Sequence, residues 1–452
     1  MTRTTASARS TRRAVLLSAS LAALLLGGCE TVNDWFGKSP PPPLPGERLA
    51  VLTGERKAEP DPQLANTPVT LPQARTNDSW SQAGGNPDNA MGHLSLAAAP
   101  AQAWTAGIGS GSSSALRLLN APVVAQGRVY AMDAVGQITA LDERTGRQLW
   151  RADARPEKRR GDAMGGGVAV AEGRLFATTG YGEVLALNPD DGAVLWRKRV
   201  PGPVRSAPTV AGGTVFVVTI DNQTVALSTA DGTVRWNHAG IVETAGLLGT
   251  ASPAVNGSLV VVPYSSGELY GLRAENGRVA WQDSLAAIRR GGALSSIPDI
   301  RGLPVIDRGQ VFAVGHSGRM ISLDERIGAR LWEAEIGGVQ TPWVAGDHLF
   351  MLDNDNEVVA LTRRSGRVRW VAPLERFKDP KDRKDPITWA GPVLAGERLW
   401  LTGSNGVLLA LDPASGREIG RYSLPAATYL PPVVANNTLY VLSDNGTLAA
   451  YR

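Results

Sequence analysis

The chain has 452 residues, of which 43% are hydrophobic and 19% are charged, a balance that supports a large folded core and excludes a wholly disordered chain. Its single cysteine excludes a framework of internal disulfides. The 46 Lys and Arg outnumber the 42 Asp and Glu, but the first 28 residues hold four arginines and no acid, so the remainder is electrically balanced. Because nucleic-acid binding needs a surplus of cationic side chains, this balance argues against a nucleic-acid partner.

The N-terminus has the pattern of a secretory leader followed by a lipid attachment site. Arginines precede an apolar run over 14–26, and small residues follow it directly before Cys29. A membrane-spanning helix needs about 20 apolar residues, so this run is too short to predict one. The arrangement resembles the lipobox of bacterial lipoproteins, which implies a signal peptide over 1–28 and lipidation of the Cys29 thiol. An uncleaved anchor, and twin-arginine export through Arg12 and Arg13, are the alternatives.

Proline is concentrated directly after this leader. Residues 40–43 form an unbroken proline block, and five further prolines follow by residue 72. Such segments are extended because polyproline II is already their preferred conformation, and they show little apolar periodicity. The sequence therefore predicts a lipidated, proline-rich tether over 29–78 that holds a folded body away from a membrane.

From residue 79 to residue 452 the chain repeats a unit of about 43.5 residues. Each unit contains short apolar runs separated by turn residues, which predicts four strands joined by tight hairpins. A proline or valine opens each copy: Pro122, Val168, Pro208, Pro253, Pro304, Pro342, Pro392 and Pro432. A tryptophan that follows a glycine by four residues ends six copies: Trp150, Trp196, Trp236, Trp281, Trp332 and Trp370. The seventh copy has Gly420 at the tryptophan position.

The eighth copy begins at Pro432 and ends with the chain after only three predicted strands. Upstream of the first copy, Trp104 precedes Pro122 by 18 residues, as Trp150 precedes Val168 by 18. The segment around Trp104 is therefore expected to supply the missing strand, which is possible only if the two ends meet. Ring closure also protects the edges of the sheets. The predicted fold is all-β, an eight-bladed β-propeller of four-stranded antiparallel blades whose last blade is closed by an N-terminal strand.

The recurring tryptophans are expected to be structural. A tryptophan on the outermost strand can fill the wedge between neighbouring blades, and small residues would leave room for it: Ala140, Ala186, Ala226, Ala360 and Ala410. The glycine before each tryptophan supplies a positive φ for the last hairpin. The alternative, that the tryptophans are binding aromatics, is less consistent with their regular recurrence.

The spacing of Ala, Gly and Trp resembles the PQQ-like repeat of quinoprotein dehydrogenases and their non-enzymatic relatives. The enzymes carry a vicinal disulfide above the cofactor, whereas the single cysteine here is assigned to the lipobox. No set of carboxylate and Asn side chains suggests a calcium-bound quinone. We therefore predict no enzyme activity, no catalytic residue and no cofactor.

Other candidate sites are also explained more simply by structure. The four histidines are scattered without the spacing of metal ligands: His93, His238, His316 and His348. The acidic run 353–357 has Val358 where a calcium-binding EF-hand loop requires glycine, which favours a solvated turn. The glycine-rich segment 109–114 lacks the lysine of a phosphate loop and is expected to connect two blades. We predict no metal site.

The connections between blades differ in length. Measured from a tryptophan to the next opening residue, they reach 17 residues over 236–253, 23 over 281–304 and 22 over 370–392. In four-stranded antiparallel blades these connections lie on the same face as the hairpins between the second and third strands. Loops on a rigid scaffold carry recognition, so this face is where function is expected.

The lipobox, the tether, the eight repeats and the lack of further cysteines together resemble the BamB family, the lipoprotein subunits of the outer-membrane β-barrel assembly machinery. Residues 80–86 and 91–93, together with 294–304, resemble the alphaproteobacterial members. The resemblance implies a non-enzymatic scaffold that is anchored in the outer membrane, faces the periplasm, and assists the assembly and insertion of outer-membrane β-barrel proteins.

The resemblance also implies partners and contact residues. The expected partners are the POTRA domains of BamA and other barrel-assembly subunits, with unfolded outer-membrane proteins as further candidates. Family contacts lie in the loops before blades four and five, at positions occupied here by Leu247, Leu248 and Asp299. The family pattern has arginine where this chain has Leu248. A quinone-dependent enzyme and a ligand-binding periplasmic propeller are the alternatives.

Overall fold

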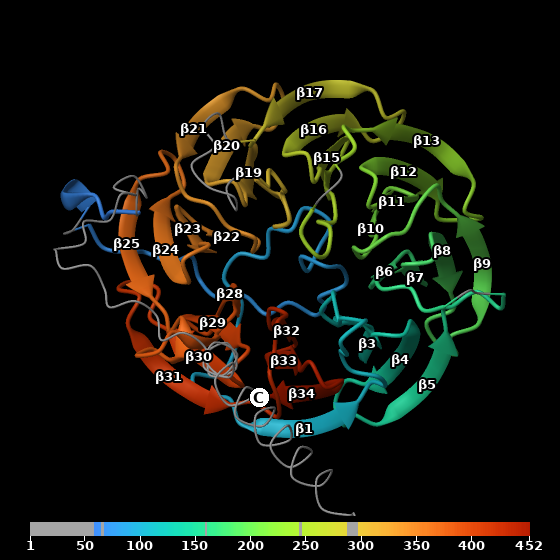
Figure 1. The fold of residues 1–452 in the computed structure, drawn as a ribbon, viewed down its shortest axis with the longest axis horizontal. Coiled ribbons are helices and arrows are strands. Elements are labelled where there is room, and N and C mark those ends of the chain that lie inside the picture. The colour runs from blue at the N-terminus through green and yellow to red at the C-terminus, as the bar shows by residue number, and fades with distance from the viewer. Residues whose placement is uncertain (1–57, 65–66, 159–160, 244–245, 287–296) are drawn as a thin grey trace, which may run out of the picture. The chain divides into compact units, whose positions relative to one another are not determined.

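The computed structural model describes residues 58–64, 67–158, 161–243, 246–286 and 297–452, all within one compact unit. Their strands form eight four-stranded antiparallel sheets arranged around a common centre (Figure 1), so the predicted eight-bladed propeller is confirmed. No helix among these residues is long and apolar enough to cross a membrane. Cys29 and the predicted leader lie outside the described residues.

Each of the first seven blades contains four consecutive strands, ordered from the centre outward. Blades one and two contain β2 (Val123–Ala125), β3 (Arg128–Met132), β4 (Gln137–Asp142), β5 (Gln148–Asp153), β6 (Val168–Ala171), β7 (Arg174–Thr179), β8 (Glu183–Leu187) and β9 (Val194–Arg199). Blades three and four contain β10 (Thr209–Ala211), β11 (Thr214–Val218), β12 (Gln223–Ser228), β13 (Val234–Ala239), β14 (Ala254–Asn256), β15 (Leu259–Pro263), β16 (Glu268–Arg273) and β17 (Val279–Ser284).

The remaining blades follow the same plan. Blades five and six contain β18 (Val305–Asp307), β19 (Gln310–Gly315), β20 (Arg319–Asp324), β21 (Arg330–Ala334), β22 (Trp343–Ala345), β23 (His348–Leu352), β24 (Glu357–Thr362) and β25 (Val368–Pro373). Blade seven contains β28 (Trp389–Ala395), β29 (Arg398–Gly403), β30 (Val407–Leu411) and β31 (Glu418–Ser423). Two smaller elements lie outside the blades, the hairpin of β26 (Phe377–Asp379) and β27 (Lys384–Pro386) and the 3-10 helix η1 (Pro62–Leu64).

The eighth blade joins the two ends of the propeller. It contains β32 (Val433–Ala435), β33 (Thr438–Leu442), β34 (Thr447–Tyr451) and β1 (Gln102–Gly107) in that order. Trp104 pairs with Ala450 in the antiparallel ladder of β1 and β34. Beyond it, the backbones of Ala101 and Arg452 exchange two hydrogen bonds of 2.7 and 2.9 Å. The closure predicted from the position of Trp104 is therefore confirmed.

The tryptophans join each blade to the next. The indole Nε1 of Trp236 donates a hydrogen bond of 2.8 Å to the carbonyl oxygen of Ala274 in the following blade. Trp104, Trp150, Trp196, Trp281, Trp332 and Trp370 donate equivalent bonds to Glu143, Pro189, Thr229, Glu325, Arg363 and Pro413. The glycine that precedes each tryptophan also packs against the tryptophan of the previous blade. Gly277, which precedes Trp281, is an example, since a Cβ there would lie 2.6 Å from the Trp236 ring. The structural interpretation of the tryptophans is confirmed.

Only the junction between blades seven and eight lacks this indole bond among the described strands. Gly420 pairs with Ala410 at the position where other blades pair a tryptophan with a small residue. The ring of Tyr422 lies on the same strand and packs against Trp400 of its own blade, with ring centroids 5.8 Å apart. Among the described blades, the junction between blades seven and eight is therefore the one without the repeated indole bond.

A segment that the repeat pattern does not predict crosses the centre of the ring. This N-terminal strap, residues 77–94, is the blue chain in the middle of Figure 1. Trp80 and Val124 of blade one exchange two backbone hydrogen bonds of 2.8 Å, and the Gln82 side chain bonds both the N–H and the C=O of Val210 in blade three. Further hydrogen bonds join the strap to the innermost strands of the other six blades at Val170, Val255, Ile306, Trp343, Leu394 and Val434.

Part of the predicted tether also contacts the propeller. Asp61 forms an ion pair of 2.5 Å with Arg367 beside the outermost strand of blade six, and its backbone N–H bonds the Val368 carbonyl. Nearer the centre, the N–H of Arg75 donates to the carbonyl of His93. The division into leader, tether and propeller remains a prediction for the residues before 58.

Candidate docking site on the loop face

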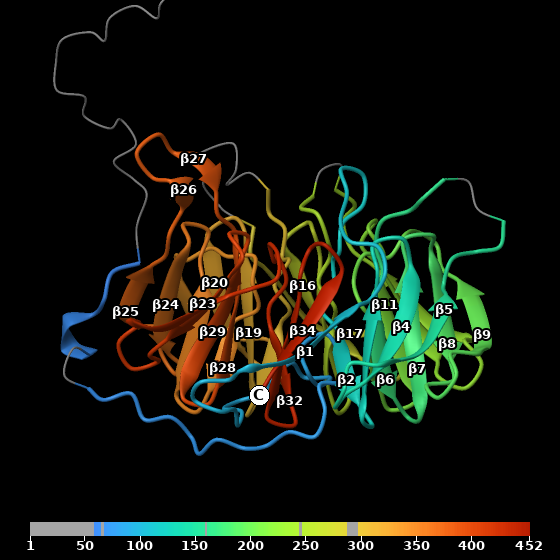
Figure 2. The ribbon, with the colours of Figure 1, turned by 90° about the horizontal axis from the view of Figure 1, so that it is seen from below.

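The two faces of the propeller are built differently. The N-terminal strap lies along one face, whereas the connections between blades and the hairpin of β26 and β27 project from the other (Figure 2). The second face, called the loop face from here on, also carries the hairpins between the second and third strands of each blade, because successive antiparallel turns alternate between the two faces. The predicted contact residues all lie on this loop face.

The structure brings the predicted contact residues together. The first loop, residues 240–253, contains Leu247 and Leu248, and the second loop, residues 285–304, contains Asp299. The backbone N–H of Leu247 donates a hydrogen bond of 2.7 Å to the Asp299 carboxylate. The two loops that the resemblance selected are therefore joined directly, although 52 residues separate the bonded positions.

Asp299 is a buried residue, with 3% of its surface exposed. Burial raises the pKa of its carboxyl group, whereas the bond from Leu247 and the electrostatic interaction with Arg301 lower it. The Asp299 carbonyl accepts a further bond of 2.9 Å from the backbone N–H of His316. This geometry gives Asp299 a positioning role, because its carboxylate holds the first loop and is covered by protein.

Three apolar side chains of the first loop are exposed. Ile241 and Val242 are 61% and 62% exposed, and Leu248 is 42% exposed, whereas Leu247 is half-buried. We call Ile241, Val242 and Leu248 the apolar docking patch. The resemblance identified Leu248 but not Ile241 or Val242. In the sequence, these two could have been found as an adjacent apolar pair in a long connection between blades.

The first loop leaves blade three on a fixed stem. The Glu268 carboxylate accepts a hydrogen bond of 2.7 Å from the N–H of Ile241, and the Asn222 side chain donates one of 2.6 Å to the Ile241 carbonyl. Gly240 sits directly on Tyr264, since a Cβ at this position would lie 2.5 Å from the phenol ring. The exposed pair therefore starts from a backbone that is held on both sides.

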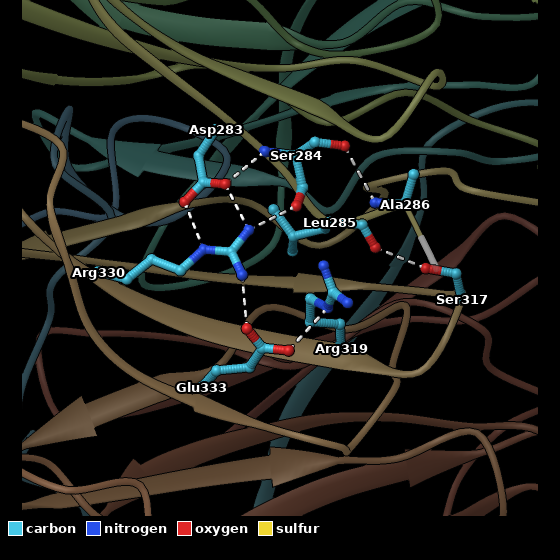
Figure 3. A network of polar contacts seen from close by, with 8 residues as sticks. All are labelled: Asp283, Ser284, Leu285, Ala286, Ser317, Arg319, Arg330 and Glu333. Carbon is cyan, nitrogen blue, oxygen red and sulfur yellow. Dashed lines mark hydrogen bonds and ion pairs between the residues drawn. The ribbon is translucent and has the colours of Figure 1, made fainter. Parts of the chain in front are cut away.

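The second loop starts from the polar network drawn in Figure 3. Arg330 donates two hydrogen bonds, of 2.8 and 2.5 Å, to the Asp283 carboxylate at the end of β17, and a third of 2.5 Å to Glu333. Two residues further on, the Leu285 carbonyl accepts a bond of 2.7 Å from the Ser317 hydroxyl. Blade five thus holds the start of the loop, while Asp299 is bonded near its end.

The histidines contribute to packing and support. His93 joins the strap to blade seven, because one ring nitrogen accepts a hydrogen bond from the Glu397 N–H while the other contacts the Pro72 carbonyl. The His238 ring nitrogen lies 2.9 Å from the buried Tyr264 hydroxyl, and burial lowers the pKa of His238. Within the part of the chain that the structure describes, no group of three His, Cys, Asp or Glu residues could hold a metal ion.

The other two sequence candidates are turns and connections. The Asp353 carboxylate accepts backbone N–H bonds of 2.9 Å from Asp355 and 2.7 Å from Glu357, which closes the hairpin of β23 and β24. Burial raises the pKa of Asp353 to about 6. Residues 109–114 connect the eighth blade to the first, and Ser110 bonds the Asp133 carboxylate there.

Comparison with known proteins was consistent with this architecture. The family described as "Outer membrane protein assembly factor BamB" matches residues 96–160, 134–372 and 376–452. The protein of that name from Yersinia pestis is 27% identical over 360 residues, which is 78% of this chain and 88% of the relative. The one from Alkalilimnicola ehrlichii is 33% identical over 350 residues, which is 77% and 87% of the two chains.

Solved structures show the same fold. The BamB of Moraxella catarrhalis has a TM-score of 0.66 at 20% identity and covers 78% of this chain and 100% of its own. A quinohemoprotein alcohol dehydrogenase from Comamonas testosteroni has a TM-score of 0.63 at 12% identity, with 84% and 81% coverage. At such identities the likeness concerns the fold alone, so it does not distinguish an assembly factor from an enzyme.

Proposed function

The chain belongs to the family of the outer membrane protein assembly factor BamB, and on that premise we propose that it is a non-enzymatic scaffold subunit of the outer-membrane β-barrel assembly machinery. In this proposal it docks on the POTRA domains of BamA, faces the periplasm and assists the insertion of outer-membrane proteins. A quinone-dependent enzyme is not favoured, because the adjacent pair of cysteines expected of such enzymes cannot be formed from one cysteine.

The observation that carries the docking proposal is the apolar docking patch on its bonded loops. Large apolar side chains exposed on one loop are candidates for a protein interface, where a few anchors that become buried supply most of the binding free energy. Ile241 and Val242 project from a stem bonded to Glu268 and Asn222, and Leu248 follows the residue that Asp299 holds. Anchors on a preorganised backbone lose less conformational entropy when they bind.

A titration against purified BamA POTRA domains tests this proposal. Val242→Asp with Leu248→Asp is expected to weaken binding roughly 30-fold or more, because each introduced carboxylate would have to be desolvated at the interface. The melting temperature should remain within about 2 °C, since both side chains are exposed in the free protein.

A matched control introduces the same two aspartates at exposed apolar positions outside the loop face. Leu195→Asp with Ile419→Asp alters two similarly exposed apolar residues on the outermost strands β9 and β31, away from the loops. This pair should retain binding. Equal affinity of both double variants and the parent would contradict the proposed docking patch, and absence of any POTRA binding by the parent would contradict the function itself.

The proposed anchor is the acylated Cys29 after removal of residues 1–28. Acyl chains bind a bilayer with about 0.8 kcal/mol per buried CH₂, so Cys29→Ser should move the protein from the membrane pellet to the soluble fraction. Fractionation of cells without the assembly machinery measures this directly. A variant that remains in the pellet there would contradict lipid anchoring.

A further inference from the structure

The centre of the propeller contains a cavity of about 130 Å³ above the N-terminal strap. Residues of the connections that precede the innermost strands line it, together with Trp80 and Asn89 of the strap. Trp80 and Trp343 stack there with ring centroids 6.1 Å apart. The cavity is therefore closed on one side by the chain's own N-terminal segment and bordered by the loops of the other face.

The charged side chains that line this cavity are cationic. Arg205 and Arg301 line it, and no Asp or Glu is among the described residues of its lining. Neither arginine forms an ion pair with any residue that the structure describes. The Asp299 carboxylate lies outside the lining, accepts a bond from Leu247 and interacts electrostatically with Arg301.

Two residues that line the cavity also carry donors without acceptors. The Nε of Arg205 and the hydroxyl of Thr250 are buried and have no hydrogen-bond partner in the described structure. A buried donor without an acceptor destabilises the fold by about 1–3 kcal/mol, and a buried unpaired cation by more. Burial lowers the pKa of the Arg301 guanidinium, whereas the charge of Asp299 raises it. Such groups are explained most directly by an acceptor that is supplied from outside the chain.

We propose that this cavity binds an organic carboxylate, with Arg205 and Arg301 as the groups that hold its charge. The planar guanidinium offers paired donors that match the two oxygens of a carboxylate. The indole rings of Trp80 and Trp343 and the side chain of Leu303 provide apolar wall for the body of the ligand. An inorganic anion would use the arginines but not this wall.

The cavity is connected to the docking loops by sequence and contact. Gly249 and Thr250 belong to the first loop, and Arg301 belongs to the second. Gly249 has φ of 97°, and a Cβ there would lie 3.3 Å from the Arg301 Nε, so glycine lets this loop approach the guanidinium. The carboxylate site nevertheless does not depend on the proposed docking, and its test uses the isolated protein.

Calorimetric titration of the purified full-length protein tests the site with phenylacetate and its uncharged isostere phenylacetamide. Phenylacetate should bind saturably and at least roughly tenfold more tightly than phenylacetamide or inorganic phosphate at equal ionic strength. Acetylated trialanine with a free or an amidated C-terminus distinguishes a chain terminus from a free acid as the source of the carboxylate. Preference for either free carboxylate supports the site, and loss of that preference overturns it.

Substitutions assign the binding to the cavity. Arg205→Gln and Arg301→Gln should each weaken phenylacetate roughly tenfold or more, whereas Arg326→Gln on an exposed turn should not. Arg301→Lys preserves the charge but not the paired donors, and it should bind with intermediate affinity if Arg301→Gln fails to fold. The proposal is overturned if the parent binds none of the carboxylates, or if folded Arg205→Gln binds as tightly as the parent.

Discussion

One face of the propeller is crossed by its own chain, whereas the other is left to loops of unequal length. On the first face, the N-terminal strap exchanges hydrogen bonds with the innermost strand of every blade. On the loop face, the two loops of the candidate site are held at their stems and by the Asp299 bond, and their apolar residues are exposed. The difference separates two tasks, because contacts that hold the ring together are kept away from the side chains that are free to meet a partner.

The largest effect is expected from opening the ring. Removal of residues 438–452 takes away β33 and β34, which leaves β1 and β32 without their partners. Exposed sheet edges and a lost blade interface should abolish the cooperative unfolding transition. Thermal melts followed by circular dichroism measure it. Deletion of residues 38–57 is the control and should leave the transition intact, and similar loss from both deletions would contradict closure by β1.

A single substitution in the strap should lower stability without affecting the loop face. Gln82→Ala leaves the N–H and C=O of Val210 without partners at a buried position. The expected loss is about 2 kcal/mol of unfolding free energy, measured by urea titration, because buried unpaired groups retain their desolvation penalty. Affinity for POTRA domains should be unchanged. A variant as stable as its parent would show that the strap contributes little to holding the ring.

Asp299→Ala is expected to weaken binding more than it lowers stability. The substitution frees the N–H of Leu247, and the first loop should become more mobile, so POTRA affinity should fall about three- to tenfold by loss of preorganisation. The unfolding free energy should fall by only about 1 kcal/mol. Asp299→Asn retains an acceptor oxygen and should restore most of the affinity. If Asn and Ala variants bind equally weakly, the carboxylate itself would contact the partner.

The smallest effect concerns the pH dependence of one loop-face turn. Asp353 has a pKa of about 6 in the folded protein, above its ordinary value, so folding favours the protonated form. The associated stability is complete below the unfolded pKa and is lost as pH rises through about 6. Asp353→Asn cannot ionise and keeps an oxygen for the bonds from Asp355 and Glu357.

The melting temperature of the variant minus that of the parent should therefore be larger at pH 8 than at pH 5. Differential scanning calorimetry of both proteins at the two pH values isolates this group from the other carboxylates. A parent and variant that differ by the same amount at both pH values would show that Asp353 does not titrate between them.

The ring could be predicted because its signals are periodic. The spacing of Trp150, Trp196 and Trp236 repeats in sequence as it repeats in space, and the displaced Trp104 identifies the strand that closes the last blade. Each of these tryptophans bonds and packs against the following blade in the same way, so the role of one copy indicates the role of the others. The exception at Gly420 was visible in the sequence for the same reason.

The strap and the details of the site could not be predicted in this way. Contacts of the strap depend on backbone groups and on single side chains such as Gln82, which carry no period. The resemblance located Asp299 but gave no sign of its burial, since burial depends on how the two loops meet. That no acidic residue among the described residues lines the cavity beside Arg205 and Arg301 is likewise visible only after the eight blades are assembled.

The pairing of β1 with β34 also fixes an order of events in the life of the chain. β1, the first strand of the propeller, has its ladder partner in β34, the last strand of the ring in chain order. The eighth blade therefore cannot form until β34 has been synthesised, even though earlier blades are available for pairing as they emerge. Until β34 is present the ring stays open, so blades one and seven each keep one face without its neighbour.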